Sequence, residues 1–473
     1  MDRIKRNIQG ILRNKTLNSA IWYTLSSVFA KSIFVMLTPI FARILTKAEY
    51  GYYTSFVSWQ NILVTVFSLE MASTVLRAKF DYSEKEFKHY IFSVTLFGIL
   101  FSAICMSIAA GVIGENSIEI LGIERKYIIS LGMVVIFSPL IEVFQAEQRA
   151  KVKYKLSSVI TIGYGAMGLV VPLGFTILCE NKLDALLYGM AFNAFALGFI
   201  ILITYTIKCG IIFRWEYIKY ALILAIPIVP HIVSINIMGN SDKLMINSMC
   251  GPDYAALYGI IYTCSMTIAL MRNALNNAWV PWFYKKMSEE KYNKIRIISD
   301  QYILWFSVGA FIVCLLGKEI VLVMGGKQYL EAAPLVPIIM LGGYYNFLNV
   351  FFLNIEFYYK KTFMISIVTV MATALNVLLN YICINLWGYM AAAYTTAFCN
   401  FIIILMHYFV TKKMNNKVIC NIKLIFSLSA IGLACCLVCI FSYQYMPFRI
   451  ILGVISISAV FILAEKSISI LVR

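Results

Sequence analysis

Two basic residues lie deep inside apolar stretches of the sequence and raise the first question about its chemistry. Lys31 lies within NSAIWYTLSSVFAKSIFVMLTPIFA (18–42), and Arg272 lies within the apolar stretch 254–279. A basic side chain in the middle of a bilayer costs roughly 2.5–3.5 kcal/mol, so it usually faces a partner, a helix bundle or a wet cavity. Arginine binds anions through a planar fork of donors, and lysine binds them as a point charge. Both residues are therefore candidates for binding an anion.

Polar residues accompany these two cations along the chain. Thr24, Lys31 and Thr38 recur every seven residues, a spacing that returns side chains to nearly the same face of an α-helix. The residues expected to bind a substrate are Lys31, Arg272, Thr24, Thr38, Asn273 and Asn276. In the alternative interpretation, Lys31 extends toward the membrane surface or pairs with Glu70 or Glu142 and holds helices together.

The composition is that of a membrane protein. Of 473 residues, 61% are hydrophobic and 13% are charged, whereas soluble domains carry about 25% charged residues. Apolar runs near the ~20 residues that cross hydrocarbon number about fourteen. They cover approximately residues 18–44, 50–72, 90–114, 127–147, 156–178, 184–207, 220–241, 254–279, 299–323, 333–355, 363–385, 388–410, 422–442 and 449–470. We expect an all-α polytopic membrane protein with about 14 transmembrane helices.

Lysine and arginine fall mainly in alternate loops, which predicts the orientation. With the N-terminus inside, 29 of these residues lie in the inner segments and nine in the outer ones, and cytoplasmic loops retain positive charge. Both termini are therefore expected in the cytoplasm. The net charge of +17 is then a topology signal, because no single loop gathers it among aromatic residues as a nucleic-acid site would. Residues 1–17 would contact anionic membrane lipids or form a simple basic tail.

The sequence repeats weakly at a spacing of about 204 residues. KAEYGYY (47–53) corresponds to PDYAALY (252–258), and ALLYG (185–189) corresponds to GYMAA (388–392). Six apolar segments per repeat give both repeats one orientation, and transporters with parallel repeats bind substrate between them. The expected domains are a cytoplasmic N-terminus at 1–17, an N-terminal lobe at 18–219, a C-terminal lobe at 220–421 and two further helices at 422–473.

Four segments carry a resemblance to a known family. They are RILTKAEYGYY (43–53), PIVPHIVSINIMGNSDKLMINSMCGPDYAALYG (227–259), NAWVPWFYKKMSE (277–289) and ALNVLLNYICINLWGYMAAAYTT (374–396). In their order and spacing the chain resembles Wzx-like polysaccharide and O-antigen flippases, the polysaccharide transporter branch of the MOP superfamily. The resemblance covers nearly the whole chain.

The resemblance implies a fold and a function. It implies two six-helix lobes in a V around a central cavity, followed by two C-terminal helices. The protein would flip an undecaprenyl-pyrophosphate-linked oligosaccharide from the inner to the outer leaflet of the bacterial cytoplasmic membrane by alternating access. The diphosphate would bind Lys31 and Arg272. The implied partners are the lipid-linked glycan, membrane lipids and glycan polymerase or assembly proteins, and the protein would be a monomer.

Three carboxylates are candidates for coupling transport to an ion gradient. Glu70 and Glu142 lie near the inner ends of their segments, and Asp242 lies near the outer end of the seventh. Coupling needs at least one carboxylate that titrates or binds an ion. The structural alternative, pairing of Glu70 and Glu142 with Arg77 or Arg149, is favoured.

Two prolines interrupt the seventh segment. Pro227 and Pro230 should bend this helix and free backbone carbonyls, and His231 follows them directly. These three residues are candidates for a gate, although a buried histidine bonded to a freed carbonyl is an equal alternative. Arg43 and Lys243 lie near outer ends of segments and are expected to be interfacial anchors.

The sequence argues against catalysis. It has no HExxH, GxSxG, P-loop or GxGxxG motif, and the longest outer loop is about a dozen residues, GENSIEILGIERK (114–126). We expect no enzyme activity, cofactor, metal or nucleic acid. His407 lies near a helix end and gives little indication of a function. The main alternative is a drug or cation antiporter of the same superfamily, and a polytopic glycan polymerase fits less well. A non-transporting scaffold for a glycan assembly complex is a third alternative that the sequence leaves open. An antiporter for cations would need an anionic cavity, so the deep cations favour an anionic substrate.

Overall fold

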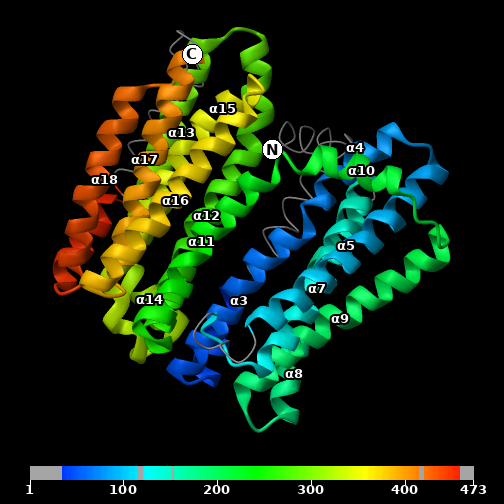
Figure 1. The fold of residues 1–473 in the computed structure, drawn as a ribbon. Coiled ribbons are helices and arrows are strands. Elements are labelled where there is room, and N and C mark those ends of the chain that lie inside the picture. The colour runs from blue at the N-terminus through cyan, green and yellow to red at the C-terminus, as the bar shows by residue number, and fades with distance from the viewer. Residues whose placement is uncertain (1–34, 114–120, 152–153, 415–419, 457, 459–473) are drawn as a thin grey trace, which may run out of the picture. The chain divides into compact units, whose positions relative to one another are not determined.

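The structure is a computed structural model that describes residues 35–113, 121–151, 154–414, 420–456 and 458 (Figure 1). All regular secondary structure in these ranges is helical, as the sequence predicts. Thr24 and Lys31, and the basic segment 1–17, lie outside the described residues.

The helices follow the predicted apolar segments closely. Their bounds are α3 Lys47–Ser68, η1 Met71–Thr74, α4 Val75–Asp81, α5 Glu84–Ile113, α7 Lys126–Ala150, α8 Tyr154–Leu178, α9 Lys182–Cys209, α10 Trp215–Ala225, α11 Val229–Cys250, α12 Pro252–Ser288, α13 Tyr292–Leu315, α14 Gly317–Gly325, η2 Lys327–Leu335, α15 Val336–Tyr358, α16 Thr362–Trp387, α17 Ala391–Met414 and α18 Ile422–Ser442. Shorter apolar helices, Val35–Ile44 and Met446–Ser456, lie within the first and last predicted segments. In the described ranges, ten helices are long and apolar enough to cross a membrane, or up to twelve if each bent pair is one span.

Local sequence signals begin and end these helices. Thr46 and Glu49 form a reciprocal capping box at the start of α3, with the Thr46 amide donating to Glu49 Oε2 at 2.8 Å. Asn181 caps α9 by accepting hydrogen bonds from two backbone amides of its first turn. Gly388 ends α16 with a φ of 73°, a conformation that glycine adopts without steric strain.

Two of the predicted spans are bent. The pair α3 and Met71–Asp81 bends by 51° where Leu69 and Glu70 both adopt positive φ values, 48° and 52°. The pair α10 and α11 bends by 61°, and Pro227 lies in the break between them. Pro230 follows in the first turn of α11, where a missing amide proton is tolerated.

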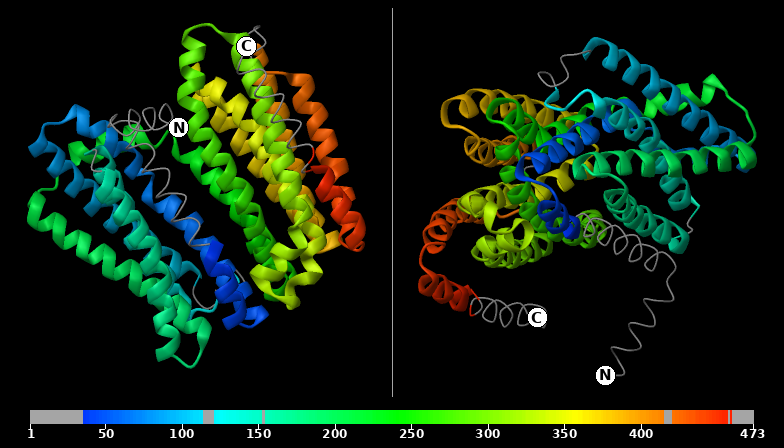
Figure 2. Two further views of the ribbon diagram at one scale, coloured as in Figure 1. Left: turned by 180° about the vertical axis from the view of Figure 1, so that it is seen from behind. Right: turned by 90° about the horizontal axis from the view of Figure 1, so that it is seen from below.

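The chain divides into two compact units, Met1–Ser248 and Met249–Arg473. In the first unit α7 packs against α3, α5, α8 and α9, and in the second unit α15 packs against α12, α13, α16, α17 and α18 (Figure 2). α15 is the more enclosed of the two, since most of its residues are buried. Helix α11 belongs to the first unit over nearly its whole length. The lobe boundary at 219/220 was predicted from the repeat and stays a prediction.

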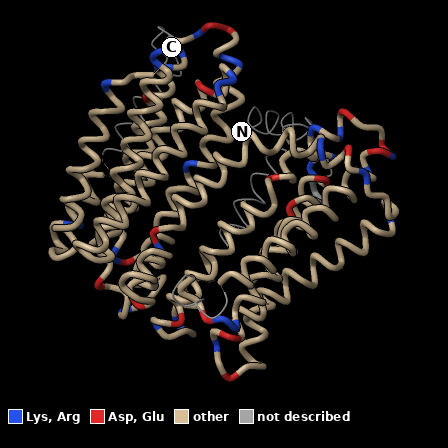
Figure 3. Tube along the Cα trace, viewed as in Figure 1, with Lys and Arg blue, Asp and Glu red and all other residues tan. Residues whose placement is uncertain are grey.

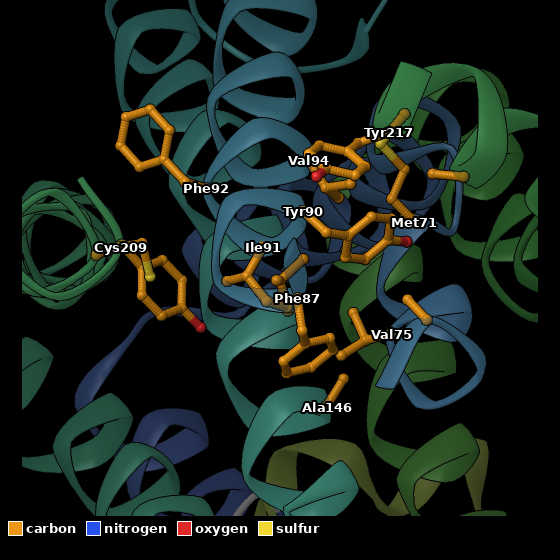
Figure 4. Packing of buried hydrophobic residues seen from close by; sticks show 14 of the residues in the cluster. Met71, Val75, Phe87, Tyr90, Ile91, Phe92, Val94, Ala146, Cys209 and Tyr217 are labelled. Carbon is orange, nitrogen blue, oxygen red and sulfur yellow. The ribbon is translucent and has the colours of Figure 1, made fainter. Parts of the chain in front are cut away.

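One apolar cluster of the first unit joins α4, α5, α7, α9 and α10. Phe87 and Tyr90 of α5 point toward Met71 and Val75, and each of these four residues is 2% exposed or less (Figure 4). The Tyr217 ring of α10 meets the Tyr90 ring edge-on, with centroids 6.1 Å apart. Burial of aromatic rings in this way holds α10 on the first unit.

Charged residues gather at the ends of the helices. Figure 3 shows most lysines, arginines, aspartates and glutamates there, while the long central stretches are almost uncharged. This distribution is expected of helices that cross hydrocarbon, where an ionised side chain is costly. The few charged residues along the helices are therefore the ones to examine for function.

Candidate functional site

Arg272 lies well inside α12 and is half-buried. Its Nη2 donates a hydrogen bond to Asn273 Oδ1 at 3.4 Å, which is long for an N–H···O bond. Among the described residues, no carboxylate forms an ion pair with Arg272. A guanidinium has five N–H donors, so most of them remain available to a ligand. The geometry suits a bound anion.

Asn276, one turn further along α12, is engaged in packing. Its Oδ1 accepts a hydrogen bond of 3.0 Å from Asn354 Nδ2 of α15. Trp279 lies beside it, with its ring 5.4 Å from the Phe351 ring of α15. This pair of contacts fixes α12 against α15, one turn from Arg272.

The first helix is described only from residue 35 onward. Within that part Thr38 is 7% exposed, whereas Ile40, on the face expected to be opposite, is 39% exposed. The described end of the predicted polar stripe therefore lies against protein. The positions of Thr24 and Lys31, on which the rest of the stripe depends, lie outside the described residues.

Glu70 and Glu142 come together in the first unit. Glu70 occupies the bend after α3, and Glu142 lines a small recess of α7 together with Ser68 and Met71, which flank Glu70 in sequence. The Glu142 side chain is exposed, and the recess that it lines borders the bend that holds Glu70. Arg77 forms an ion pair with Asp81, with Nε and Oδ2 2.8 Å apart.

The outer part of α11 carries a buried polar group. Asp242 is 1% exposed and Lys243 is 8% exposed. Lys243 Nζ donates to Asn240 Oδ1 at 3.1 Å, and the same oxygen accepts from Asn61 Nδ2 of α3 at 3.3 Å. The Lys243 amine belongs to a hydrogen-bonded contact between α3 and α11. An interfacial anchor would instead reach solvent, so the prediction that Lys243 is an anchor is wrong. Arg43 is exposed and donates to the Pro39 carbonyl at 2.7 Å.

The residues proposed for a gate lie at the break between α10 and α11. Pro227 lies in the break itself, Pro230 lies in the next turn, and His231 is half-buried beside it. The 61° bend is the distortion expected of prolines in this place. A role in gating stays a prediction.

A buried acid–base pair was missed in the sequence. His407 Nδ1 of α17 lies 2.8 Å from Glu356 Oε1 of α15, with side chains 1% and 0% exposed. Glu356 was overlooked because Lys360 and Lys361 follow it closely, so that it resembled one more charge of a loop. The repeat gave no signal for it, because a spacing of about 204 residues pairs Glu356 with Val152 and not with Glu147.

A family model described as polysaccharide biosynthesis protein matches residues 16–287. Among solved structures, the lipid II flippase MurJ in an inward closed conformation is 16% identical, with a TM-score of 0.73, covering 96% of this chain and 100% of that one. An inward-facing multidrug resistance MATE family transporter of the MOP superfamily is 10% identical, with a TM-score of 0.63, covering 86% and 96%. A MOP superfamily transporter from Pyrococcus furiosus, described as having a binding pocket of reversed polarity, is 10% identical, with a TM-score of 0.53, covering 84% and 95%. No curated protein matches the sequence.

These likenesses show the fold. The chain has the helical fold of the MOP superfamily over almost its whole length, which confirms the predicted fold class and the predicted resemblance. Its helices are those of a multi-pass membrane protein.

Proposed function

This chain belongs to the polysaccharide biosynthesis protein family, and from this premise we propose that it flips a lipid-linked oligosaccharide across the membrane. The proposed substrate is an oligosaccharide carried on undecaprenyl pyrophosphate. The proposed direction is from the inner to the outer leaflet of the bacterial cytoplasmic membrane, by alternating access, with both termini in the cytoplasm. Membrane lipids and glycan polymerase or assembly proteins would be its partners, and a monomer would suffice.

The single observation that carries this proposal is the sign of the charge at Arg272. A half-buried guanidinium without a carboxylate partner in the described chain is costly unless a ligand supplies the anion. A diphosphate does so, and the planar fork of arginine can bind two of its oxygens at once. Asn273 lies next to Arg272 and would donate its amide to the same group.

The remaining predicted contacts complete the proposed site. Lys31 would supply a second positive charge, and Thr24, Thr38 and Asn276 would supply hydroxyl and amide groups. In the structure Asn276 accepts from Asn354, which leaves its own amide N–H groups for a ligand. The same proposal includes ion coupling, for which the candidates are Glu70, Glu142 and Asp242. It also includes gating, for which the candidates are Pro227, Pro230 and His231.

A second candidate function rests on a different observation. Glu142 is exposed and lines a recess that borders the bend at Glu70, so the first unit holds two carboxylates in one region. Such a pair would attract an organic cation, and export of cationic drugs is the corresponding function. Charge again separates the two hypotheses, because one needs Arg272 and the other needs Glu142.

The test uses the purified full-length protein in lipid vesicles. Undecaprenyl-pyrophosphate-linked oligosaccharide with a fluorescent sugar is placed in both leaflets, and an impermeant quencher reports how fast the inner pool reaches the outside. We expect faster exchange than in protein-free vesicles, and exchange lost in Arg272→Ala but kept in Asn277→Ala, an exposed position on the same helix. Two results together would overturn the proposal in favour of drug export. They are exchange no faster than in protein-free vesicles and uptake of a cationic dye that needs Glu142.

A further inference from the structure

Each unit carries a buried glutamate near the C-terminal end of one of its long helices. Glu147 lies near the C-terminal end of α7, the fourth predicted span, and Glu356 lies near the C-terminal end of α15, the tenth. Each glutamate faces the helix two spans later, where Tyr205 of α9 and His407 of α17 are its partners. The correspondence allows one site to be compared with the other.

The first-unit site is a satisfied structural ion pair. Glu147 Oε1 pairs with Lys151 Nζ, one turn along the chain. Its Oε2 accepts from the Tyr205 hydroxyl at 2.9 Å and from Gln148 Nε2 at 3.2 Å. Both carboxylate oxygens therefore have donors, and a permanently charged amine balances the negative charge.

The second-unit site differs both in the donors to its carboxylate and in its charge partner. Glu356 Oε1 meets His407 Nδ1 at 2.8 Å, while Glu356 Oε2 is buried and has no hydrogen-bond partner among the described residues. The charge partner is an imidazole, which gains or loses a proton near neutral pH, where a lysine does not. A carboxyl oxygen without a donor, 0% exposed, is rare in folded proteins and calls for an explanation.

We infer that Glu356 and His407 form a proton-binding site that couples proton movement to the transport cycle. With one shared proton the pair is neutral overall and suits its apolar surroundings. Gain or loss of a proton leaves a net charge that burial makes costly, so the pair must reach water before it can change state. A rearrangement of α15 against α17 would give that access to Glu356 Oε2, and the proton would then drive or follow the change. The inference rests on the proposed transport function and adds a coupling group in the second unit to the candidates Glu70, Glu142 and Asp242 of the first.

Other titratable groups lie at the same end of the second unit. On the elements packed against α15 they are Tyr284, Lys285 and Lys286 of α12, Tyr292, Lys294, Arg296, Asp300 and Tyr302 of α13, Lys360 and Lys361 before α16, Tyr408, Lys412 and Lys413 of α17, and Lys423 of α18. Side-chain hydrogen bonds and ion pairs of Glu356 and His407 reach none of these groups in the described structure. Asp300 accepts instead from Asn421 Nδ2, and Lys412 lies over the Tyr408 ring. Asp300 Oδ1 is likewise buried without a hydrogen-bond partner among the described residues, but Asp300 is only half-buried and has no imidazole beside it, whereas Glu356 is fully buried and pairs with His407.

The first arm measures proton binding without transport. The chain has three histidines, so His89→Asn and His231→Asn leave His407 as the only imidazole to label with 13C for NMR. In the full-length protein in detergent, we expect its signal to change once between about pH 5 and 9. With Glu356→Gln added, the imidazole should remain neutral throughout, because a buried cation would lack its counter-charge. An imidazole signal that is constant over this range in both proteins would overturn the inference.

The second arm measures coupling in the vesicle assay described above. An imposed pH difference should change the exchange rate in the wild-type protein and leave the rate unchanged in Glu356→Gln and in Glu356→Gln/His407→Asn. In the double variant two amides can still form a hydrogen bond between α15 and α17. This variant therefore serves as a control for loss of folding. Glu147→Gln is the matched control, which should lose stability but keep its response to pH. A wild-type exchange rate that is the same with and without a pH difference would end the coupling inference and leave the flippase proposal standing. Absent exchange in a protein whose His407 signal changes with pH would do the reverse.

Discussion

Asn354 of α15 donates a hydrogen bond of 3.0 Å to Asn276 of α12, one helical turn from Arg272 and two residues from Glu356. This contact joins the helix proposed to bind the anion to the helix proposed to bind the proton. Because helices are stiff, a movement of α15 would be transmitted to α12 through it and through the neighbouring Trp279–Phe351 contact.

Arg272→Ala should reduce glycan export by about 10- to 100-fold, since a hydrogen bond to a charged group contributes ~1.5–3 kcal/mol and 1.4 kcal/mol is a factor of ten. Arg272→Lys should keep part of the activity, because it keeps the charge and loses the fork geometry. Export and protein abundance are measured together in cells. A well-expressed Arg272→Ala protein with normal export would contradict the proposed site.

Asn354→Ala and Asn276→Ala should each lower the free energy of unfolding by about 1–3 kcal/mol, because each leaves a polar partner unsatisfied. The double variant should lose less than the sum of the two, as expected for residues that act through one contact. Thermal unfolding of the purified protein in detergent provides the comparison. Additive losses would mean that the two amides contribute independently.

Gly122→Ala should destabilise the first unit. Gly122 has a φ of 65°, and a Cβ atom there would lie 2.3 Å from Asn247 Nδ2, the atom that donates to the Gly122 carbonyl at 2.9 Å. Backbone strain of this kind costs about 1–3 kcal/mol. Adding Asn247→Ala should relieve the clash, so the double variant should lose less than the two single losses together. An unfolding temperature equal to that of the wild-type protein would contradict the close approach.

Glu289, in the turn after α12, should contribute to stability only above acidic pH. Hydrogen bonds from Lys286 and Lys291 lower the pKa of its carboxyl from 4.5 to about 2. A group whose pKa is lowered by folding stabilises the folded state above its unfolded pKa and loses that effect as the pH falls toward 2. The difference in unfolding temperature between wild-type protein and Glu289→Gln should therefore be constant above about pH 5 and shrink below pH 4.5. This difference in unfolding temperature should also decrease with added salt, since the turn is exposed to solvent.

Reporter fusions should confirm the orientation. A periplasm-active enzyme fused after Lys182 should be active, and the same enzyme fused after Lys361 should be silent, because the positive charges place these sites on opposite faces. The inverse pattern would reverse the topology and the proposed direction of transport with it.

Hydropathy and proline chemistry were enough to predict most of the fold. Each of the fourteen apolar segments contains at least part of a helix in the described ranges, and the bend at Pro227 was expected because proline removes a backbone donor. The bend at Leu69 and Glu70 was not predicted, because neither residue favours a positive φ and tertiary packing imposes it.

The candidate site was predicted less completely. Arg272 was recognised because a cation in an apolar segment is conspicuous on its own. Glu356 and His407 were missed because each is ordinary in sequence, and only the packing of α15 on α17 places them 2.8 Å apart. Lys243 was misjudged because distance from the end of a segment does not say which side of the helix is covered.

Helix α12 is longer than the hydrocarbon core of a membrane is thick. Its 37 residues extend about 55 Å at ~1.5 Å per residue, well beyond the ~30 Å of hydrocarbon. Arg272 lies roughly 30 Å from the start of α12, slightly beyond the middle of the helix. The guanidinium is therefore far from both ends of α12, so its loss should impair passage of the diphosphate through the hydrocarbon rather than its arrival at either surface.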